Sequence, residues 1–364
     1  MLMIRKGYYS VELADGCVWG LEACAGTEDW VDNLAAVLGL TVMEAGMPGC
    51  LLSFRRRPAR SRPGLNGPVP FGPTRFGDSP GVGWRRYLLP DIVMWENPAT
   101  RHTICLLPET GTLEEELEQM RRVLLPLYWE ALRRGGLPLH AALAETGGRG
   151  VILAGRSGAG KSTCCRRLEP PWMAQSDDLV LVVRDEAGRF LAHPLPTWSA
   201  VRKGIRERPW NINRPIPLEG IFFLEQAAED GLEPLGGASA TLRIRQSALQ
   251  VLGSLGPCIE SERDVRANAT LFENAADLAA SLPSCILRVS LTGRFWEKIE
   301  EALEKGDSPL FQACPVASRA SAGSASCRAS ASAAASPRTI TAGATSGRPS
   351  GSAKRRAHRA FSPG

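Results

Sequence analysis

Residues 150–168 read GVILAGRSGAGKSTCCRRL: an apolar run, a glycine-rich turn that ends in Gly-Lys-Ser-Thr, and residues that can form a helix. Residues 155–163 satisfy the pattern G-x-x-x-x-G-K-[ST], in which glycines let successive backbone N–H groups point inward at a phosphate. VILAG before the turn is typical of a buried strand, and KSTCCRRL after it is compatible with a helix. This context favours a phosphate-binding loop over a glycine-rich turn without a ligand.

A loop of this kind predicts ATP and Mg²⁺ as ligands. Lys161 would reach the β and γ phosphates, and the Ser162 hydroxyl would bind Mg²⁺. The expected nucleotide-binding residues are Gly155, Ser157, Gly158, Ala159, Gly160, Lys161, Ser162 and Thr163.

Two acids follow the loop closely. A phosphate loop does not choose the acceptor of the phosphoryl group, so the chain also needs a carboxylate that orients or deprotonates the attacking oxygen. Asp177 and Asp178 stand immediately before the apolar run LVLVV, whereas the usual ATPase carboxylate ends an apolar strand well downstream. Either the strand runs antiparallel to the expected one, or the acids come from the preceding turn. The short spacing disfavours transporters and motor proteins.

The segment HAALAETGGRGVILAGRSGAGKST (140–163), followed by SDD (176–178), resembles the catalytic domain of HPr kinase/phosphorylase and its relatives. The fold of that family is similar to that of phosphoenolpyruvate carboxykinase. The resemblance implies ATP-dependent phosphorylation of a Ser hydroxyl on a protein or peptide. The matching residues are His140 near the phosphates or the acceptor, Lys161 on the phosphates, Ser162 and Asp177 on Mg²⁺, and Asp178 as general base. For His140 the alternative is a structural role at a strand end.

One segment departs from that family. Its bifunctional members carry a glycine-rich signature with a Mg²⁺-binding Glu where this chain has HPLPTWSAVRKGIRE (193–207), in which no acid gives a convincing match. His193 is a candidate for the missing group, although a hydrogen-bonded strand-end histidine is the simpler interpretation. A second set of residues, Arg202, Lys203, Arg206 and Arg208, belongs either to a loop that closes over phosphate or to a solvated helix face.

A more divergent branch fits these features better. The segments SDDLVLVV, HPLPTWSAVRKG, PIPLEGIFFLEQA and LPSCILRVSLTGRFWEKI resemble kinase-like proteins of modified-peptide biosynthesis cassettes. Residues 8–305 are most similar to the SynChlorMet cassette family ScmC. Such cassettes carry radical-SAM/SPASM enzymes and a small peptide chaperone, so the resemblance implies a ribosomal peptide precursor as partner. Two rivals to a peptide kinase stay open: an ATP-binding assembly factor that transfers nothing, and a small-metabolite kinase.

We expect an α/β chain in three parts. Residues 1–134 form a small α+β region with a long Arg/Pro/Gly loop at 55–86, which is either a mobile connection or a basic clamp. Residues 135–307 form a P-loop kinase domain of the HPr kinase and phosphoenolpyruvate carboxykinase type. Residues 308–364 are rich in Ser, Ala and Arg and are expected to be disordered.

Local patterns predict several elements of the first part. Asp15-Gly16 predicts a hairpin turn, and the apolar spacing in residues 28–40 predicts a helix. A Thr-x-x-Glu capping box opens a helix over residues 112–134, in which Pro126 predicts a kink.

The composition excludes some function classes. The chain is 44% hydrophobic and 22% charged, has no apolar run long enough to cross a membrane and begins without a signal peptide pattern, so we expect a cytoplasmic protein without a membrane partner. Eight basic residues after position 307 account for the net charge of +5, and residues 1–307 carry −3. Nucleic acid is therefore not an expected partner. The ten cysteines lack metal-ligand spacing and are expected to be reduced thiols without zinc.

Overall fold

The computed structural model describes residues 8–42, 48–57, 80–204, 209–254 and 262–304. Most of the Arg/Pro/Gly loop, the side chains of Arg206 and Arg208 and the tail after residue 307 lie outside the described residues, so the predictions made for them stay predictions. Within the described ranges the protein has a mixed α/β architecture with two sheets. None of the helices in these ranges is both long and apolar enough to cross a membrane.

The first sheet has six strands in the order β1-β2-β3-β6-β5-β4. The turn at Asp15-Gly16 joins β1 and β2 in an antiparallel hairpin, which confirms the prediction. The β2–β3 and β3–β6 pairs are parallel. The six strands are β1 (Tyr8–Glu12), β2 (Val18–Ala23), β3 (Cys50–Arg56), β4 (Arg85–Leu88), β5 (Val93–Asn97) and β6 (His102–Leu107).

Three helices accompany this sheet in the sequence. The helix α1 (Glu28–Leu38) confirms the amphipathic pattern, since Trp30, Leu34 and Leu38 are buried. The expected single helix over 112–134 is wrong: the structure has α2 (Leu113–Arg122) and α3 (Leu125–Arg133). Pro126 lies in the first turn of α3, where its missing N–H costs no helical hydrogen bond, so the chain breaks the helix instead of kinking it. The N-cap of the expected capping box is confirmed, because the Thr112 hydroxyl accepts from the Glu115 N–H, although the Glu115 carboxylate accepts from the Gly111 N–H instead of the Thr112 N–H.

The second sheet has nine strands. Seven follow the order β10-β8-β9-β13-β12-β11-β7, and β15 pairs with β13 while β14 pairs with β15. The first residues of β13 pair with β12, and its later residues pair in parallel with both β9 and β15. The nine strands are β7 (Leu137–Leu139), β8 (Ala141–Thr146), β9 (Arg149–Ala154), β10 (Met173–Ser176), β11 (Val180–Arg184), β12 (Phe190–Pro194), β13 (Ile216–Gln226), β14 (Gly231–Pro234) and β15 (Ser284–Val289).

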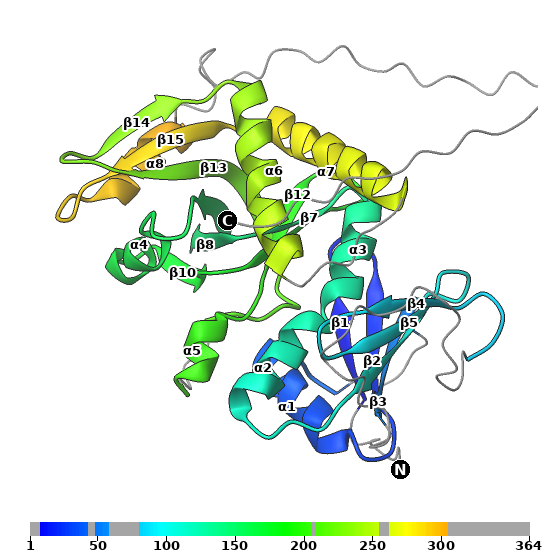
Figure 1. Ribbon diagram of the computed structural model, residues 1–364. Helices are drawn as coiled ribbons and strands as arrows, with labels where there is room; N and C mark the ends of the chain where they lie inside the picture. Colours follow the sequence, from blue (N-terminus) through cyan, green and yellow to red (C-terminus); the bar gives the residue numbers. More distant parts are fainter. Residues whose placement is uncertain (1–7, 43–47, 58–79, 205–208, 255–261, 305–364) are drawn as a thin grey trace, which may run out of the picture. The chain divides into compact units, whose positions relative to one another are not determined.

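Helices cover both faces of the central strands of this sheet. On one face α6 (Gly237–Ser254) and α7 (Glu262–Ser281) lie side by side (Figure 1) and pack on β8, β9 and β13. On the other face α4 (Lys161–Arg167) and α8 (Phe295–Glu304) contribute Cys164, Phe295 and Ile299 to a separate apolar cluster. The buried Cys164 thus packs α4 against the sheet. The short helix α5 (Trp198–Arg202) follows β12.

The strand β11 connects two apolar clusters. Its residues alternate, with Val180 and Val182 in the cluster under α6 and α7, and Leu181 and Val183 in a cluster with the first sheet and α1 to α3. The expected boundary at residues 134 and 135 falls between the two sheets, but the apolar cluster that contains Leu181 runs across it. The division into two domains therefore stays a prediction.

Candidate functional site

The glycine-rich loop lies between β9 and α4, in the strand–loop–helix order that its sequence predicts. Gly155 must be glycine because a Cβ there would lie 2.8 Å from the Ala159 Cβ. Gly160 has a φ of +106°, which L side chains rarely adopt. Gln226, at the end of β13, donates from Nε2 to the Gly158 carbonyl at 2.9 Å. The loop is thus shaped by its own backbone and tied to the neighbouring strand.

Lys161 is a buried cation at the start of α4, with 7% of the residue exposed. Its Nζ donates to the carbonyls of Gly155 at 2.9 Å and Arg156 at 3.3 Å. Burial lowers the pKa of the Lys161 ammonium, and the charges of Asp178 and Asp177 partly oppose this effect. The ammonium is therefore a desolvated positive charge close to two carboxylates.

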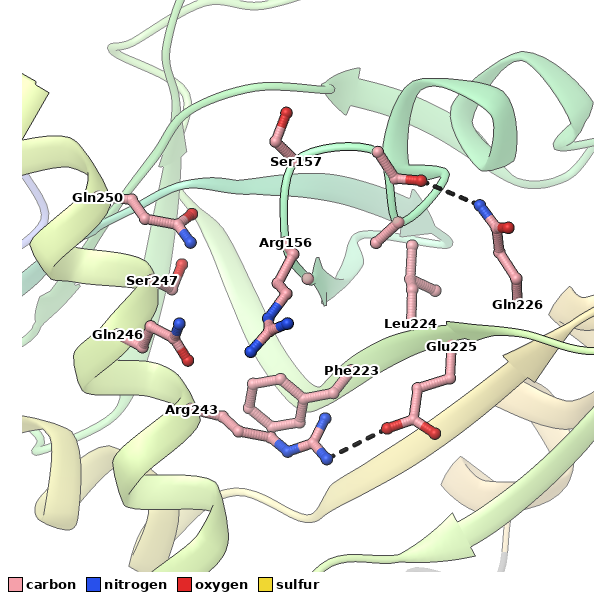
Figure 2. Close-up of a pocket in the computed structure, with 13 residues that line it drawn as sticks. Arg156, Ser157, Phe223, Leu224, Glu225, Gln226, Arg243, Gln246, Ser247 and Gln250 are labelled. Atoms are coloured by element: carbon pink, nitrogen blue, oxygen red, sulfur yellow. Dashed lines mark hydrogen bonds and ion pairs between the residues drawn. The ribbon is translucent and has the colours of Figure 1, made fainter.

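A cavity of about 630 Å³ lies beside the loop. Figure 2 shows Arg156 from the loop, Phe223 from β13 and Gln250 from α6 around this space. Arg243 also lies at its edge, where it pairs with Glu225 at 3.1 Å. The remaining lining residues are Gly155, Ser157, Gly158, Ala159, Leu224, Gln226, Gln246 and Ser247.

Asp177 and Asp178 lie in the turn between β10 and β11, so the acids come from a turn, one of the two arrangements expected. The Thr197 hydroxyl donates to Asp177 Oδ1 at 2.6 Å. His140 Nδ1 lies 3.3 Å from Asp178 Oδ1 and 3.1 Å from the Asp178 carbonyl oxygen. The His140 main chain is held by Ser247, whose hydroxyl donates to the His140 carbonyl at 3.1 Å. His140 and Asp178 therefore form a positioned pair.

A second cavity, of about 320 Å³, contains this pair in its wall. It shares Ser157 and Gln250 with the first cavity, so the two spaces adjoin at the glycine-rich loop. Its lining comes from segments far apart in the sequence: Arg121, Tyr128, His140, Ser157, Asp178, Leu179, Trp198, Gln250 and Val251.

Three of the side chains around the second cavity carry a buried polar atom without a protein partner. The Tyr128 hydroxyl, Trp198 Nε1 and Gln250 Oε1 make no hydrogen bond within the described part of the chain. Burial also raises the pKa of the Tyr128 hydroxyl, so it stays a neutral donor. Buried polar groups are normally hydrogen-bonded. Three such groups at one small cavity indicate that a bound molecule, or water in its absence, completes their hydrogen bonding.

The structure brings together only some of the residues expected from the sequence. Gly155, Ser157, Gly158 and Ala159 line the first cavity, and His140 and Asp178 line the second. Five other expected residues line neither cavity, namely Gly160, Lys161, Ser162, Thr163 and Asp177.

His193 has a structural role rather than a catalytic or metal-side one. Nε2 accepts from the Ala14 N–H at 3.0 Å, so the opposite nitrogen, Nδ1, donates to the Ile212 carbonyl. The residue is fully buried on β12. The structure therefore supports the simpler interpretation of His193, a hydrogen-bonded histidine at the end of a strand.

Sequence patterns did not reveal the residues that shape the second cavity. Tyr128 lies on α3, Trp198 on α5 and Gln250 on α6, and each belongs to an ordinary apolar or amphipathic pattern. Only Trp198 had a sequence signal that could have pointed to this cavity, because it lies in the segment 193–207, which departs from the HPr kinase pattern.

In a comparison with family models, residues 103–304 match SynChlorMet cassette protein ScmC. The match covers more than half of the chain. It begins within β6 and ends with α8, so it includes the glycine-rich loop, His140 and both aspartates. No curated protein matches the chain. The chain belongs to the ScmC family of SynChlorMet cassette proteins.

Proposed function

We propose that this protein binds MgATP in the first cavity and transfers the γ-phosphoryl group to a hydroxyl bound in the second. The observation that supports the proposal most strongly is the junction of the two cavities at Ser157, with Asp178 in the wall of the second. A phosphotransferase needs two adjoining compartments of this kind, one for the donor and one for the acceptor.

The first cavity suits a nucleotide. Its volume falls within the range of ligand pockets, about 300–1,000 Å³. Residues 155–159, the first part of the pattern G-x-x-x-x-G-K-[ST], form one wall, and the aromatic ring of Phe223 provides an apolar surface. A phosphate group would give the buried Lys161 ammonium a counter-charge and replace the carbonyl contacts that it now makes.

The chemistry proposed for the second cavity is proton removal from the acceptor. As the acceptor oxygen bonds to the γ-phosphorus, the bond from that phosphorus to the bridging oxygen of ADP breaks. The hydroxyl proton passes to the Asp178 carboxylate, and ADP leaves with the electron pair. His140, which lies 3.3 Å from Asp178 Oδ1, orients this carboxylate.

Mg²⁺ would be held by Ser162 and Asp177. Both offer the oxygen ligands that Mg²⁺ prefers, and Thr197 orients the Asp177 carboxylate through its hydroxyl. The ion would neutralise charge on the β and γ phosphates.

The acceptor class follows from the resemblance and from the family. A seryl hydroxyl of a ribosomal peptide precursor is the first candidate, with radical-SAM/SPASM enzymes and a small peptide chaperone as further cassette partners. A second candidate is a small hydroxyl compound, because the second cavity is compact at about 320 Å³ and has unpartnered polar atoms around it.

Incubation with γ-labelled ATP and Mg²⁺ tests the proposal. The acceptors are the peptide encoded in the same cassette and, in parallel, a panel of small hydroxyl compounds that includes free serine. Asp178→Asn removes the proposed base. Asp185→Asn is the matched control, because Asp185 lies in the β11–β12 turn and pairs with Arg189.

Label that moves to either acceptor with wild-type and Asp185→Asn protein, and not with Asp178→Asn, supports the kinase. The acceptor that becomes labelled decides between peptide and small compound. ATP binding without transfer to the peptide or to any of the small compounds contradicts the kinase and favours an ATP-binding assembly factor.

A further inference from the structure

Two cysteines that are far apart in the sequence meet in the first sheet. Cys17 precedes β2 and Cys50 begins β3, and the parallel pairing of these strands places their Sγ atoms 3.5 Å apart. Both residues are buried, with 3% and 2% exposed. In a tetrahedral site with metal–sulfur distances of about 2.3 Å, two thiolates lie about 3.8 Å from each other. The observed separation is close to this value without any movement of the backbone.

Glu130 on α3 completes a group of three ligand atoms. One carboxylate oxygen of Glu130 and the two Sγ atoms all lie within 4.8 Å of one another. The carboxylate is already oriented: Arg133 Nε donates to Oε2 at 3.0 Å, and Arg134 Nε donates to Oε1 at 3.1 Å. Each carboxylate oxygen has two acceptor positions, so these bonds leave one for a metal. Metal-binding carboxylates are commonly held by such additional hydrogen bonds.

Two further observations favour a ligand at this place. Asp15 Oδ2 is buried and accepts no hydrogen bond from the described residues, although Arg134 Nε lies 3.8 Å away. A cavity of about 450 Å³ has Cys50 and Glu130 in its wall, which gives an ion a path from solvent.

The cations around the cluster do not prevent metal binding. The positive charges of Arg101 and Arg134 favour the thiolate form of Cys50, and Arg133 pairs with Glu130 and Glu96. Each thiol releases its proton when it binds a metal, so a divalent cation replaces two protons and the net charge of the cluster is unchanged. The arginines then face two thiolates and a carboxylate, which they stabilise.

We propose that Cys17, Cys50 and Glu130 form a site for a thiophilic divalent cation, best represented by Zn²⁺. Two thiolates and one carboxylate select Zn²⁺ over Mg²⁺ or Ca²⁺, which prefer oxygen ligands alone. The site joins the start of β2, β3 and α3, and none of its three residues lines either cavity beside the glycine-rich loop. It does not depend on the proposed phosphotransfer.

Titration of the reduced, metal-free full chain with Co²⁺ tests the site. Tetrahedral coordination by two thiolates produces thiolate-to-cobalt charge-transfer absorption and intense visible bands, and one equivalent of Zn²⁺ should remove both. Cys17→Ser and Cys50→Ser should abolish the charge-transfer absorption. Cys105→Ser is the matched control, because Cys105 is a buried thiol on β6 that lies outside the three-residue group. Glu130→Gln should weaken Co²⁺ binding by at least about tenfold.

X-ray absorption of the Zn²⁺-loaded wild type gives a second readout if the serine variants do not fold. Two sulfur and two oxygen or nitrogen neighbours around the zinc support the site. No charge-transfer absorption in the wild type, absorption that persists in both serine variants, or a sulfur-free zinc shell would each overturn it. Recovery of a Cys17–Cys50 disulfide in the wild type under reducing conditions would overturn it as well.

Discussion

The two cavities that adjoin at Ser157 differ in how the chain builds them. The first takes one wall from a single continuous segment, residues 155–159, whose conformation depends on its own glycines. The second draws on α2, α3, α5, α6 and the turn between β10 and β11. A local motif can therefore predict a place for a phosphate, whereas the place for an acceptor depends on tertiary packing. If the first cavity binds the nucleotide and the second binds the acceptor, a substitution in either cavity should affect the binding of one ligand and leave the binding of the other unchanged.

The largest effect on ligand binding is expected from Lys161→Met, which should weaken ATP binding by about 10–100-fold. The variant loses a charged donor to the phosphates, worth about 1.5–3 kcal/mol. Because burial already disfavours the ammonium, a methionine of similar shape should not lower the melting temperature. Calorimetric titration with ATP measures the effect, and Lys298→Met on the exposed side of α8 is the control. Unchanged ATP affinity in Lys161→Met would contradict the assignment of the first cavity.

Tyr128→Phe should raise the KM for the acceptor by about five- to tenfold, since one neutral hydrogen bond contributes about 1 kcal/mol. The KM for ATP should not change. The Tyr128 hydroxyl has no protein partner within the described ranges, so its removal should leave the melting temperature equal or higher. Steady-state kinetics with each substrate varied in turn separates the two effects. Tyr9→Phe, which removes a hydroxyl bonded to Asp32, serves as control. A change in the KM for ATP alone would break the distinction between the cavities.

Gln226→Ala should weaken ATP binding by about threefold and leave the KM for the acceptor unchanged. Its Nε2 holds the Gly158 carbonyl at 2.9 Å, and loss of an exposed bond of this kind costs less than about 1 kcal/mol. The same titration as for Lys161→Met measures it. An equal loss of affinity for ATP and acceptor would show that the loop controls both cavities.

The smallest effect concerns stability rather than either ligand. Burial lowers the pKa of His193, while its bond to Ile212 and the charge of Asp15 partly oppose this. His193 therefore binds a proton near pH 6.5 in the unfolded chain, whereas in the folded chain it stays neutral at that pH. The stability of the folded state is fully present above that pH and is lost as the pH falls. His193→Gln should reduce the drop in melting temperature between about pH 7.5 and about pH 5.5. An unchanged drop would assign the acid sensitivity to other groups.

Elements with local signals could be predicted from the sequence. The Asp15-Gly16 hairpin, the buried face of α1, the Thr112 cap and the strand–loop–helix around residues 155–163 each depend on residues close together in the chain. The break before Pro126 was predicted as a kink, because the sequence shows that proline disrupts a helix but not whether the chain restarts it.

Features that depend on distant contacts could not be predicted. The Sγ atoms of Cys17 and Cys50 meet because β2 and β3 run parallel. The spacing of the two cysteines in the sequence is not that of a known metal-ligand motif, so it did not predict that they would meet. Tyr128 and Trp198 have the character of core residues, and only the absence of a partner for their polar atoms distinguishes them. That absence depends on the packing of several helices and can be seen only in three dimensions.

Single-turnover phosphoryl transfer by Asp178→Asn, measured beside its affinity for MgATP, tests most directly whether Asp178 serves the acceptor rather than the nucleotide. With the general base removed, the transfer rate should fall by about 10²–10⁴-fold, while the dissociation constant for MgATP stays within about twofold of the wild type. Transfer at the wild-type rate would contradict the role of Asp178 as base. A parallel loss of MgATP binding would place this carboxylate in the nucleotide site instead.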